Sequence, residues 1–277
     1  MSATLQNKMT GLGLVLPAML VIALFFIFPL LYSIVGAFQS EAGWGLENFN
    51  KAFELYKSDI LFTFLIVCLS TLGIGIASVA IGGYLTLGEN PRAVSILRWL
   101  YRWPMFVPFI VAAQVLRTFL SKNGMFNTSL DWLGVMDMAT AGSYLDWRGI
   151  VFAFVWKQTP FVTLLVAGAM ASLDRATIEA ARNLGASRLR ILIEIIVPQV
   201  SKTLTTGLIL SFVTMMSVLS VPLMINAQSP TMITANIAFR INAYGDFGVA
   251  NALGMISLIM TGAVAWIYLR SSMKERA

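Results

Sequence analysis

The sequence of 277 residues has no histidine and only one cysteine. A single thiol, Cys68, cannot form an internal disulfide framework. Transition-metal sites in proteins are built mainly from cysteine and histidine, and the common nucleophilic triads need an imidazole base. We therefore expect neither a metal site nor a catalytic centre in this chain.

Charge is also scarce, since 12% of the residues are charged and 58% are hydrophobic. A soluble domain carries about 25% charged residues, and about 20 apolar residues suffice to cross a bilayer as a helix. The longest stretches without any charge are residues 9–40, 60–88, 203–239 and 247–269. Four membrane spans are predicted from them.

Two further segments, less uniformly apolar, are also predicted to span the membrane. One begins with Pro104 and Pro108, and the other contains Lys157 and Gln158. The six predicted spans are residues 10–38, 60–87, 103–120, 149–172, 203–225 and 247–269. They should be helices, because a helix satisfies its own backbone hydrogen bonds in lipid and the alternating pattern of a membrane barrel is missing. The first span lacks a strongly basic start and is long for a cleaved signal peptide, so it is interpreted as uncleaved.

The basic residues are unevenly distributed between the two sides that these spans define. Twelve lie on one side and five on the other. The richer side carries Lys8, Arg92, Arg98, Arg102, Arg175, Arg182, Arg188, Arg190, Lys202, Arg270, Lys274 and Arg276. The positive-inside rule places this side, with both termini and the 173–202 loop, in the cytoplasm. Topology accounts for the excess of basic residues, so no nucleic-acid partner is expected.

The long cytoplasmic loop contains start and stop signals for two helices. Residues 176–184 are good helix formers, and Asp174 precedes them as a candidate N-cap. Gly185 tolerates the left-handed backbone that ends helices, and Ser187 can cap a second helix. Pro198 is then expected to break or kink that helix before the fifth span. Composition alone also fits an amphipathic helix pair that rests on lipid headgroups.

The order of residues in this loop resembles a family signature. The residues that carry it are Glu179, Ala180, Ala181, Gly185, Ile195, Val197 and Pro198. Their spacing is similar to Glu-Ala-Ala, three residues, Gly, nine residues, Ile, one residue, Leu-Pro, the signature of bacterial binding-protein-dependent ABC importer permeases. Only Val197 departs from it, and conservatively. The resemblance extends over about residues 60–270.

The resemblance implies an all-α integral membrane protein with six transmembrane helices and the type I ABC importer permease fold. It implies a coupling helix pair between helices 4 and 5 that docks on a cytoplasmic ATPase. Residues 1–59 would hold the first span and a periplasmic loop, residues 60–270 the permease domain with the coupling loop 173–202, and residues 271–277 a cytoplasmic tail. The implied ATPase-coupling residues are Glu179 as the acidic contact, Ala180 and Ala181 for close docking, Gly185 for the turn, and Ile195 and Pro198 as seats of the second helix.

The same resemblance implies a set of partners in a bacterial inner membrane. These are a second permease subunit (a related chain or a copy of this one), two cytoplasmic ATPase subunits, a periplasmic or extracellular solute-binding protein and membrane lipid. ATP and magnesium belong to the ATPase, so this chain is expected to bind no cofactor and to be no enzyme. It has no Gly-x-x-x-x-Gly-Lys-Ser/Thr phosphate loop.

Polar residues within spans often line a transport path. Gln114, Lys157 and Asn226 are the candidates here. The chain looks most like the spermidine/putrescine-type branch of the family, which indicates a polyamine or another small polar solute such as iron, thiamine or a phosphonate. A sugar-type or glycerol-phosphate-type permease is the alternative. An ion-coupled secondary transporter is an alternative of another class, but it would favour a buried carboxylate, and no Asp or Glu lies well inside a predicted span.

Overall fold

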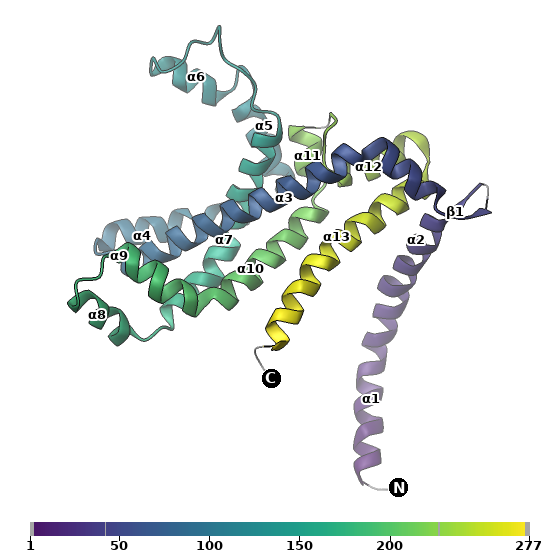
Figure 1. The fold of residues 1–277 in the computed structure, drawn as a ribbon, viewed down its shortest axis with the longest axis horizontal. Coiled ribbons are helices and arrows are strands. Elements are labelled where there is room, and N and C mark those ends of the chain that lie inside the picture. The colour runs from purple at the N-terminus through teal and green to yellow at the C-terminus, as the bar shows by residue number, and fades with distance from the viewer. Residues whose placement is uncertain (1–2, 42, 227, 275–277) are drawn as a thin grey trace. The chain divides into compact units, whose positions relative to one another are not determined.

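In the computed structural model, residues 3–41, 43–226 and 228–274 are described, and most of them are helical (Figure 1). The helices are α1 (Ala3–Ile22), α2 (Phe28–Phe38), α3 (Glu47–Leu87), α4 (Pro91–Leu100), α5 (Phe109–Leu120), α6 (Met125–Trp132), α7 (Trp147–Ala171), α8 (Arg175–Asn183), α9 (Arg188–Arg190), α10 (Val197–Ser217), α11 (Ser220–Ile225), α12 (Ile233–Phe239) and α13 (Phe247–Lys274). Strands β1 (Gln39–Ser40) and β2 (Gly43–Trp44) form a small antiparallel hairpin. The predicted all-α class is confirmed.

Within the described residues, five helices are long and apolar enough to cross a membrane, and one sharply bent helix pair would make a sixth span. The five are Gly13–Phe38, Glu47–Leu87, Trp147–Ala171, Arg188–Ser217 and Phe247–Ile267. The bent pair is Pro91–Phe106 with Phe109–Trp132, at an angle of 106°. The predicted set of six spans therefore agrees with the structure, although two of them differ in form.

The third predicted span, 103–120, is not one straight helix. Helix α4 begins at Pro91, and a 3-10 turn covers Trp103–Phe106 before α5 starts. Val107 is extended (φ −87°, ψ 123°), because a residue that precedes a proline avoids the helical region. Pro104 and Pro108 thus divide this segment.

The side chain of Lys157 in α7 donates hydrogen bonds to the backbone at this break. Its ammonium donates hydrogen bonds to the carbonyl oxygens of Pro104 at 2.8 Å and Met105 at 3.1 Å. It also lies 5.2 Å from the centre of the Phe109 ring. Backbone carbonyls without helical partners are costly in lipid, so Lys157 has a structural task in this fold.

The helix predicted to break at Pro198 is continuous from Arg188 to Ser217. A π-helical turn, Ile191–Ile196, directly precedes Val197 and Pro198. A proline ring clashes with the carbonyl four residues before it in a regular α-helix, and the wider π turn changes that register. The predicted break is absent for this reason. Instead, the helix ends at Ser217, and the predicted span 203–225 is divided between α10 and α11.

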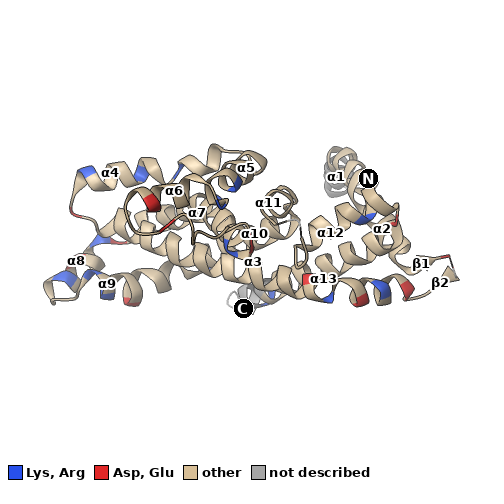
Figure 2. Ribbon diagram, turned by 90° about the horizontal axis from the view of Figure 1, so that it is seen from above, with Lys and Arg blue, Asp and Glu red and all other residues tan. Residues whose placement is uncertain are grey.

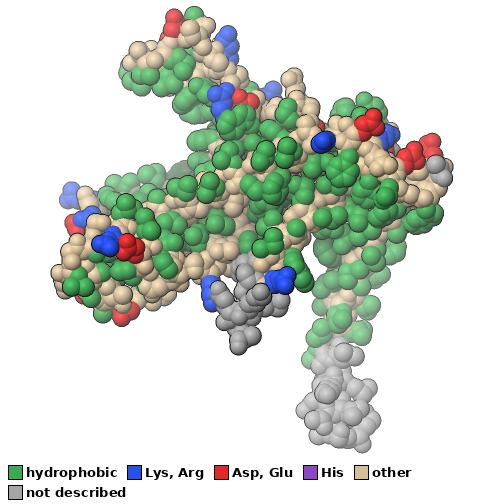
Figure 3. All heavy atoms as spheres, viewed as in Figure 1, with side chains coloured by type: hydrophobic (Ala, Val, Ile, Leu, Met, Phe, Trp, Pro, Cys, Tyr) green, Lys and Arg blue, Asp and Glu red, His purple; other side chains and the backbone are tan. Residues whose placement is uncertain are grey.

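The chain forms two compact units, and each is described by itself. The larger one comprises residues 58–235 and 259–277. In it α7 packs against α5, α10 and α11, and the centre of the core contains the buried side chains of Phe154, Val162, Val166 and Met215. Hydrophobic side chains cover much of its outer surface, while charged ones gather near α8 and α9 (Figure 3). Such an apolar exterior suits lipid as the surrounding solvent.

The smaller unit comprises residues 1–57 and 236–258. Arg240 donates to the Tyr56 hydroxyl at 2.6 Å and pairs with Asp246 at 3.4 Å, and Lys51 pairs with Asp246 at 3.1 Å. Ser33 also donates to the Asn251 side chain at 2.8 Å. These polar contacts join the start of α3 and the end of α2 to the start of α13.

Two glycines of α7 give a matched stability test. A Cβ at Gly149 would lie 2.5 Å from the Tyr144 carbonyl oxygen, whereas a Cβ at Gly168 would meet nothing within 4 Å. Gly149→Ala should destabilise the protein by about 1–3 kcal/mol, because backbone must shift. Gly168→Ala should be neutral or stabilise it by about 0.5–1 kcal/mol. Thermal unfolding of the purified chain in detergent checks both, and equal midpoints for the two variants would contradict the packing described here.

Lys157→Met should destabilise the chain by about 1.5–3 kcal/mol, because two carbonyls in the break between α4 and α5 lose a charged donor. Lys122→Met is the control, since Lys122 is exposed on the loop before α6. The same unfolding measurement applies. An unfolding midpoint for Lys157→Met as high as that of the control would show that the break needs no donor.

Candidate functional site

The loop 173–202 contains the predicted helix, turn and second helix. Helix α8 starts where the Asp174 carboxylate accepts the Ala176 N–H at 2.9 Å. It ends in a Schellman motif, in which the N–H of Gly185 bonds the Arg182 carbonyl at 2.9 Å and that of Ala186 bonds the Ala181 carbonyl at 3.0 Å. Gly185 has φ +82°, the left-handed conformation expected of it. These local predictions are confirmed.

The second helix also begins as the sequence indicates. The Ser187 hydroxyl accepts the Arg190 N–H at 3.3 Å. Arg188 forms an ion pair with Glu89, just beyond the end of α3, and Arg190 pairs with Glu194 at 2.9 Å. From here the helix continues without interruption to Ser217. The helix that follows the turn at Gly185 is therefore the same one that enters the predicted fifth span.

The helix pair is attached to the bundle at three points. Ile178 is buried against the core, and Arg182 donates to the Leu87 carbonyl at the end of α3 at 3.3 Å. On the second helix, Leu192 lies so close to α3 that a Cβ at Gly83 would meet it at 2.7 Å. The helix pair thus contacts the last part of α3 at two places. The sequence pattern did not reveal these attachments, because they join distant segments.

The signature residues differ in exposure. Glu179 and Ala180 are exposed on α8, Ala181 and Ile195 are half-buried, and Gly185 and Pro198 are exposed. Three large apolar side chains on the same helix pair are also exposed, and sequence reasoning did not single them out. They are Leu184, Leu189 and Ile193, with 89%, 65% and 56% of their surface accessible. Leu189 and Ile193 lie beside Leu72 and Ile76 of α3, whereas Leu184 is at the turn after α8.

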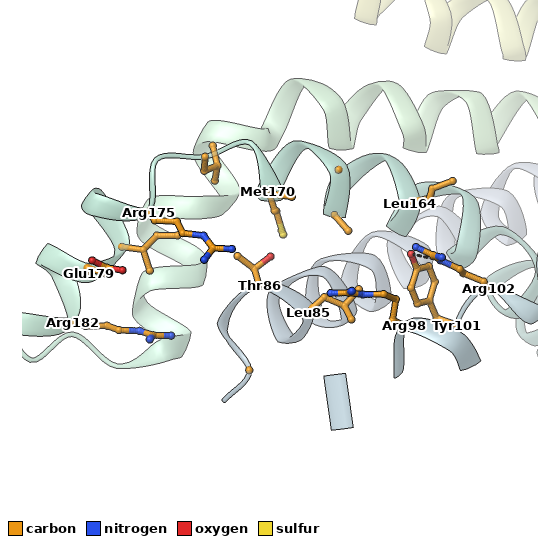
Figure 4. A pocket seen from close by; sticks show the side chains of 16 residues that line it. Leu85, Thr86, Arg98, Tyr101, Arg102, Leu164, Met170, Arg175, Glu179 and Arg182 are labelled. Carbon is orange, nitrogen blue, oxygen red and sulfur yellow. Dashed lines mark hydrogen bonds between the residues drawn. The ribbon is translucent and has the colours of Figure 1, made fainter. Parts of the chain in front are cut away.

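A cavity of about 590 Å³ lies between α8 and the neighbouring helices. Glu179 is at its edge, and Arg98, Arg102, Arg175 and Arg182 line it (Figure 4). Lys and Arg residues are also seen on α4, α8 and α9 in Figure 2. The site therefore combines an exposed apolar surface with a basic cavity.

The three residues predicted for a substrate path lie on three different helices. Gln114 is exposed on α5, Lys157 is bonded to the backbone of the break as described above, and Asn226 ends α11. The Asn226 amide donates to the Pro230 carbonyl at 3.1 Å. Helices α5 and α11 pack together, but in the described part of the chain no hydrogen bond links these three side chains to one another.

Asp59 is a buried carboxylate that the sequence analysis placed outside the spans. It lies within α3 and is 1% exposed, one residue before the predicted span 60–87. It accepts the Thr231 N–H at 2.7 Å and the Ser229 hydroxyl at 3.3 Å. Thr63 next to it accepts the Ile233 N–H at 2.9 Å. Asp59 thus holds the loop before α12. In the sequence it only precedes an apolar run that begins at Ile60, and nothing there indicates that it is buried.

Two carboxyl groups just outside the spans have lowered pKa values. The hydrogen bond from Arg148 lowers the pKa of Asp146, the N-cap of α7, below its usual range. Burial works to raise the pKa of Asp246, but the bonds from the Val249 N–H and Lys51 outweigh it, so that this pKa is also lowered. Both groups are therefore charged at neutral pH and serve as anchors of helix ends.

The comparisons with known proteins place these features in a family. Residues 78–272 match the family described as "Binding-protein-dependent transport system inner membrane component". The trehalose/maltose transport system permease protein MalF of Thermococcus litoralis is 27% identical, with 98% of this chain and 96% of that protein covered. The spermidine/putrescine transport system permease protein PotB of Escherichia coli is 24% identical, with 82% of each covered.

Solved structures support the same fold. A chain in the crystal structure of a bacterial alginate ABC transporter, in complex with an alginate pentasaccharide-bound periplasmic protein, has a TM-score of 0.81 at 19% identity, with 98% of this chain and 96% of that chain covered. A chain of the MetNI methionine ABC transporter has a TM-score of 0.58 at 15% identity, with 79% of this chain and 94% of that chain covered. The chain is a transport subunit and belongs to the family of binding-protein-dependent transport system inner membrane components, the permeases of ABC importers.

Proposed function

We propose that this permease forms the solute path of an ATP-driven importer and that the helix pair of α8 and α9 couples it to a cytoplasmic ATPase. The observation that carries the proposal is the exposed surface of Glu179, Leu184 and Leu189 on a helix pair that is fixed to the bundle. Charged and apolar groups side by side suit a specific protein partner. Glu179 would contact a basic residue of that partner.

The coupling would be mechanical. A helix pair that is held by Ile178 and Arg182, and continuous with α10, transmits a push on α8 to the spans as a rigid-body motion. The ATPase supplies the differential binding energy that moves the permease between its two states. ATP and magnesium would be bound there, and this chain would bind neither.

The assembly would follow the pattern of the family. The permease would pair with a related chain or a second copy of itself, above two ATPase subunits in a bacterial cytoplasmic membrane. A soluble binding protein would deliver the solute from the other side. The excess of basic residues near α4, α8 and α9 supports a cytoplasmic position for this end and for both termini.

We infer that the solute is a saccharide. The relative with 27% identity over nearly the whole chain has trehalose and maltose in its name, and the structural relative with the TM-score of 0.81 comes from an alginate transporter. A polyamine, the solute class of the relative that is 24% identical, is the second candidate. A polycation would favour carboxylates along its path, but the candidates Gln114, Lys157 and Asn226 include none, and buried Asp59 is engaged by the loop before α12.

Glu179→Lys should lower ATPase association and solute uptake by about tenfold or more, because a like charge would face the partner's basic residue. Glu54→Lys is the matched control: it reverses an exposed carboxylate of α3 outside the coupling site. The measurements are co-purification of the ATPase and uptake into cells. Intact association and uptake with Glu179→Lys would refute the coupling role of Glu179.

The partner binding protein should bind an oligosaccharide and not spermidine in titration calorimetry. Uptake of the same labelled saccharide into cells should require this permease. Tight binding of spermidine, with no heat from maltose, trehalose or alginate oligosaccharides, would reverse the order of the two solute candidates and leave the coupling proposal untouched.

A further inference from the structure

The cavity beside α8 is lined by two pairs of arginines from different helices. Arg98 is on α4 and Arg102 lies two residues beyond the end of that helix, whereas Arg175 and Arg182 are on α8. Figure 4 shows the two sets of side chains directed into the cavity from opposite sides. The distance in sequence between them means that only the fold brings these charges together. Like charges repel, so their convergence calls for an anion between them.

The cavity lacks the carboxylates that would neutralise these arginines. Among the residues that the structure describes, Glu179 is the only acid that lines it. Arg182 uses one nitrogen on the Leu87 carbonyl, and Arg102 donates to the Tyr101 hydroxyl at 3.2 Å. In the part of the chain that the structure describes, Arg98 and Arg175 form no ion pair. The neighbouring Arg188 and Arg190, which do not line the cavity, are both paired with glutamates.

The rest of the lining and the surroundings indicate a lipid. Leu85, Leu164 and Met170 line the cavity together with the arginines. Outside it, Trp99 and Trp103 are 60% and 57% exposed and pack edge to face at 4.9 Å. Exposed tryptophans beside arginines are typical of helices at the membrane interface. A free anion would need only the charged side of this cavity, whereas a phospholipid uses both.

We propose that this cavity binds the phosphate headgroup of an anionic phospholipid of the cytoplasmic leaflet. The guanidinium groups of Arg98 and Arg175 hold the phosphate, since planar forks match its oxygens with two hydrogen bonds each. The first part of an acyl chain lies along Leu85 and Leu164. The assignment to the cytoplasmic leaflet depends on the proposed orientation of the permease. The binding site itself depends only on the cavity.

A headgroup in this position joins the coupling helix to the membrane. It bridges Arg98 on α4 and Arg175 on α8, two elements that otherwise repel each other. Basic pockets between spans on the cytoplasmic side are known to suit such headgroups. The lipid would stiffen α8 against the bundle, and the activity of the importer would depend on the content of anionic lipid.

The test is binding of phosphatidylglycerol to the purified full-length chain, measured by native mass spectrometry against phosphatidylcholine with the same acyl chains. The wild type should retain phosphatidylglycerol selectively. R98Q with R175Q should weaken this binding by about tenfold, as expected when two charged donors are lost. R92Q with R270Q is the matched control, because it removes the same charge from exposed arginines that do not line the cavity, and it should change binding by less than about twofold.

Several outcomes would overturn the proposal. Equal loss of phosphatidylglycerol binding in R98Q with R175Q and in R92Q with R270Q would show diffuse attraction by the basic surface. Displacement of the lipid by glycerol phosphate at equal concentration would show a site for a soluble anion. Loss of the lipid on addition of the partner ATPase would assign the cavity to that protein. R98K with R175K keeps the charge and should retain more of the binding than R98Q with R175Q, which separates recognition from misfolding. The comparison of lipid binding between the variants needs neither the ATPase nor transport. Its result can therefore be interpreted even if the proposed coupling role of Glu179 is wrong.

Discussion

The fold depends on the requirement that each backbone polar group within a membrane finds a partner inside the protein. A proline removes a donor and frees a carbonyl, so each proline in a span needs a local solution. At Pro104 and Pro108 the chain bends by 106°, and Lys157 donates to two carbonyls of the bend. At Pro198 a π turn widens the helix and the helix continues. The first solution gives a span in two parts, and the second gives the long helix that connects the coupling loop to the bundle.

Two basic residues, Lys157 and Arg182, bind backbone carbonyls in different parts of the fold. Lys157 lies in a span and was a candidate for the solute path, but its ammonium is used by the backbone at the bend. Arg182 lies in the cytoplasmic loop, and its guanidinium bonds the Leu87 carbonyl at the end of α3. Both side chains satisfy carbonyls that a helix end leaves free. Lys157 thus connects α7 to the break between α4 and α5, and Arg182 connects α8 to the end of α3.

Features that depend on neighbouring residues could be predicted from the sequence, and those that depend on distant segments could not. Asp174, Gly185 and Ser187 act within a few residues of themselves, so cap and turn chemistry indicated α8 and the start of α9 correctly. The start of α4 at Pro91 was missed because Arg92 and Arg98 interrupt the apolar pattern. The burial of Asp59 arises from the loop at residues 229–231, which lies far along the chain. The exposed Leu184 and the cavity between α4 and α8 likewise require the packed structure.

The two proposals for α8 use different sides of one short helix. Leu184, at the turn after α8, is 89% exposed and is proposed to contact the ATPase, whereas Arg175 and Arg182 line the cavity (Figure 4). Glu179 lies between the two at the edge of the cavity. A charge bound in the cavity would act on Glu179 over a short distance with little screening, because Debye screening needs about 8–10 Å of solvent. Lipid and ATPase would therefore influence each other through the position of α8, without any contact between them, and this mutual influence must be equal in both directions.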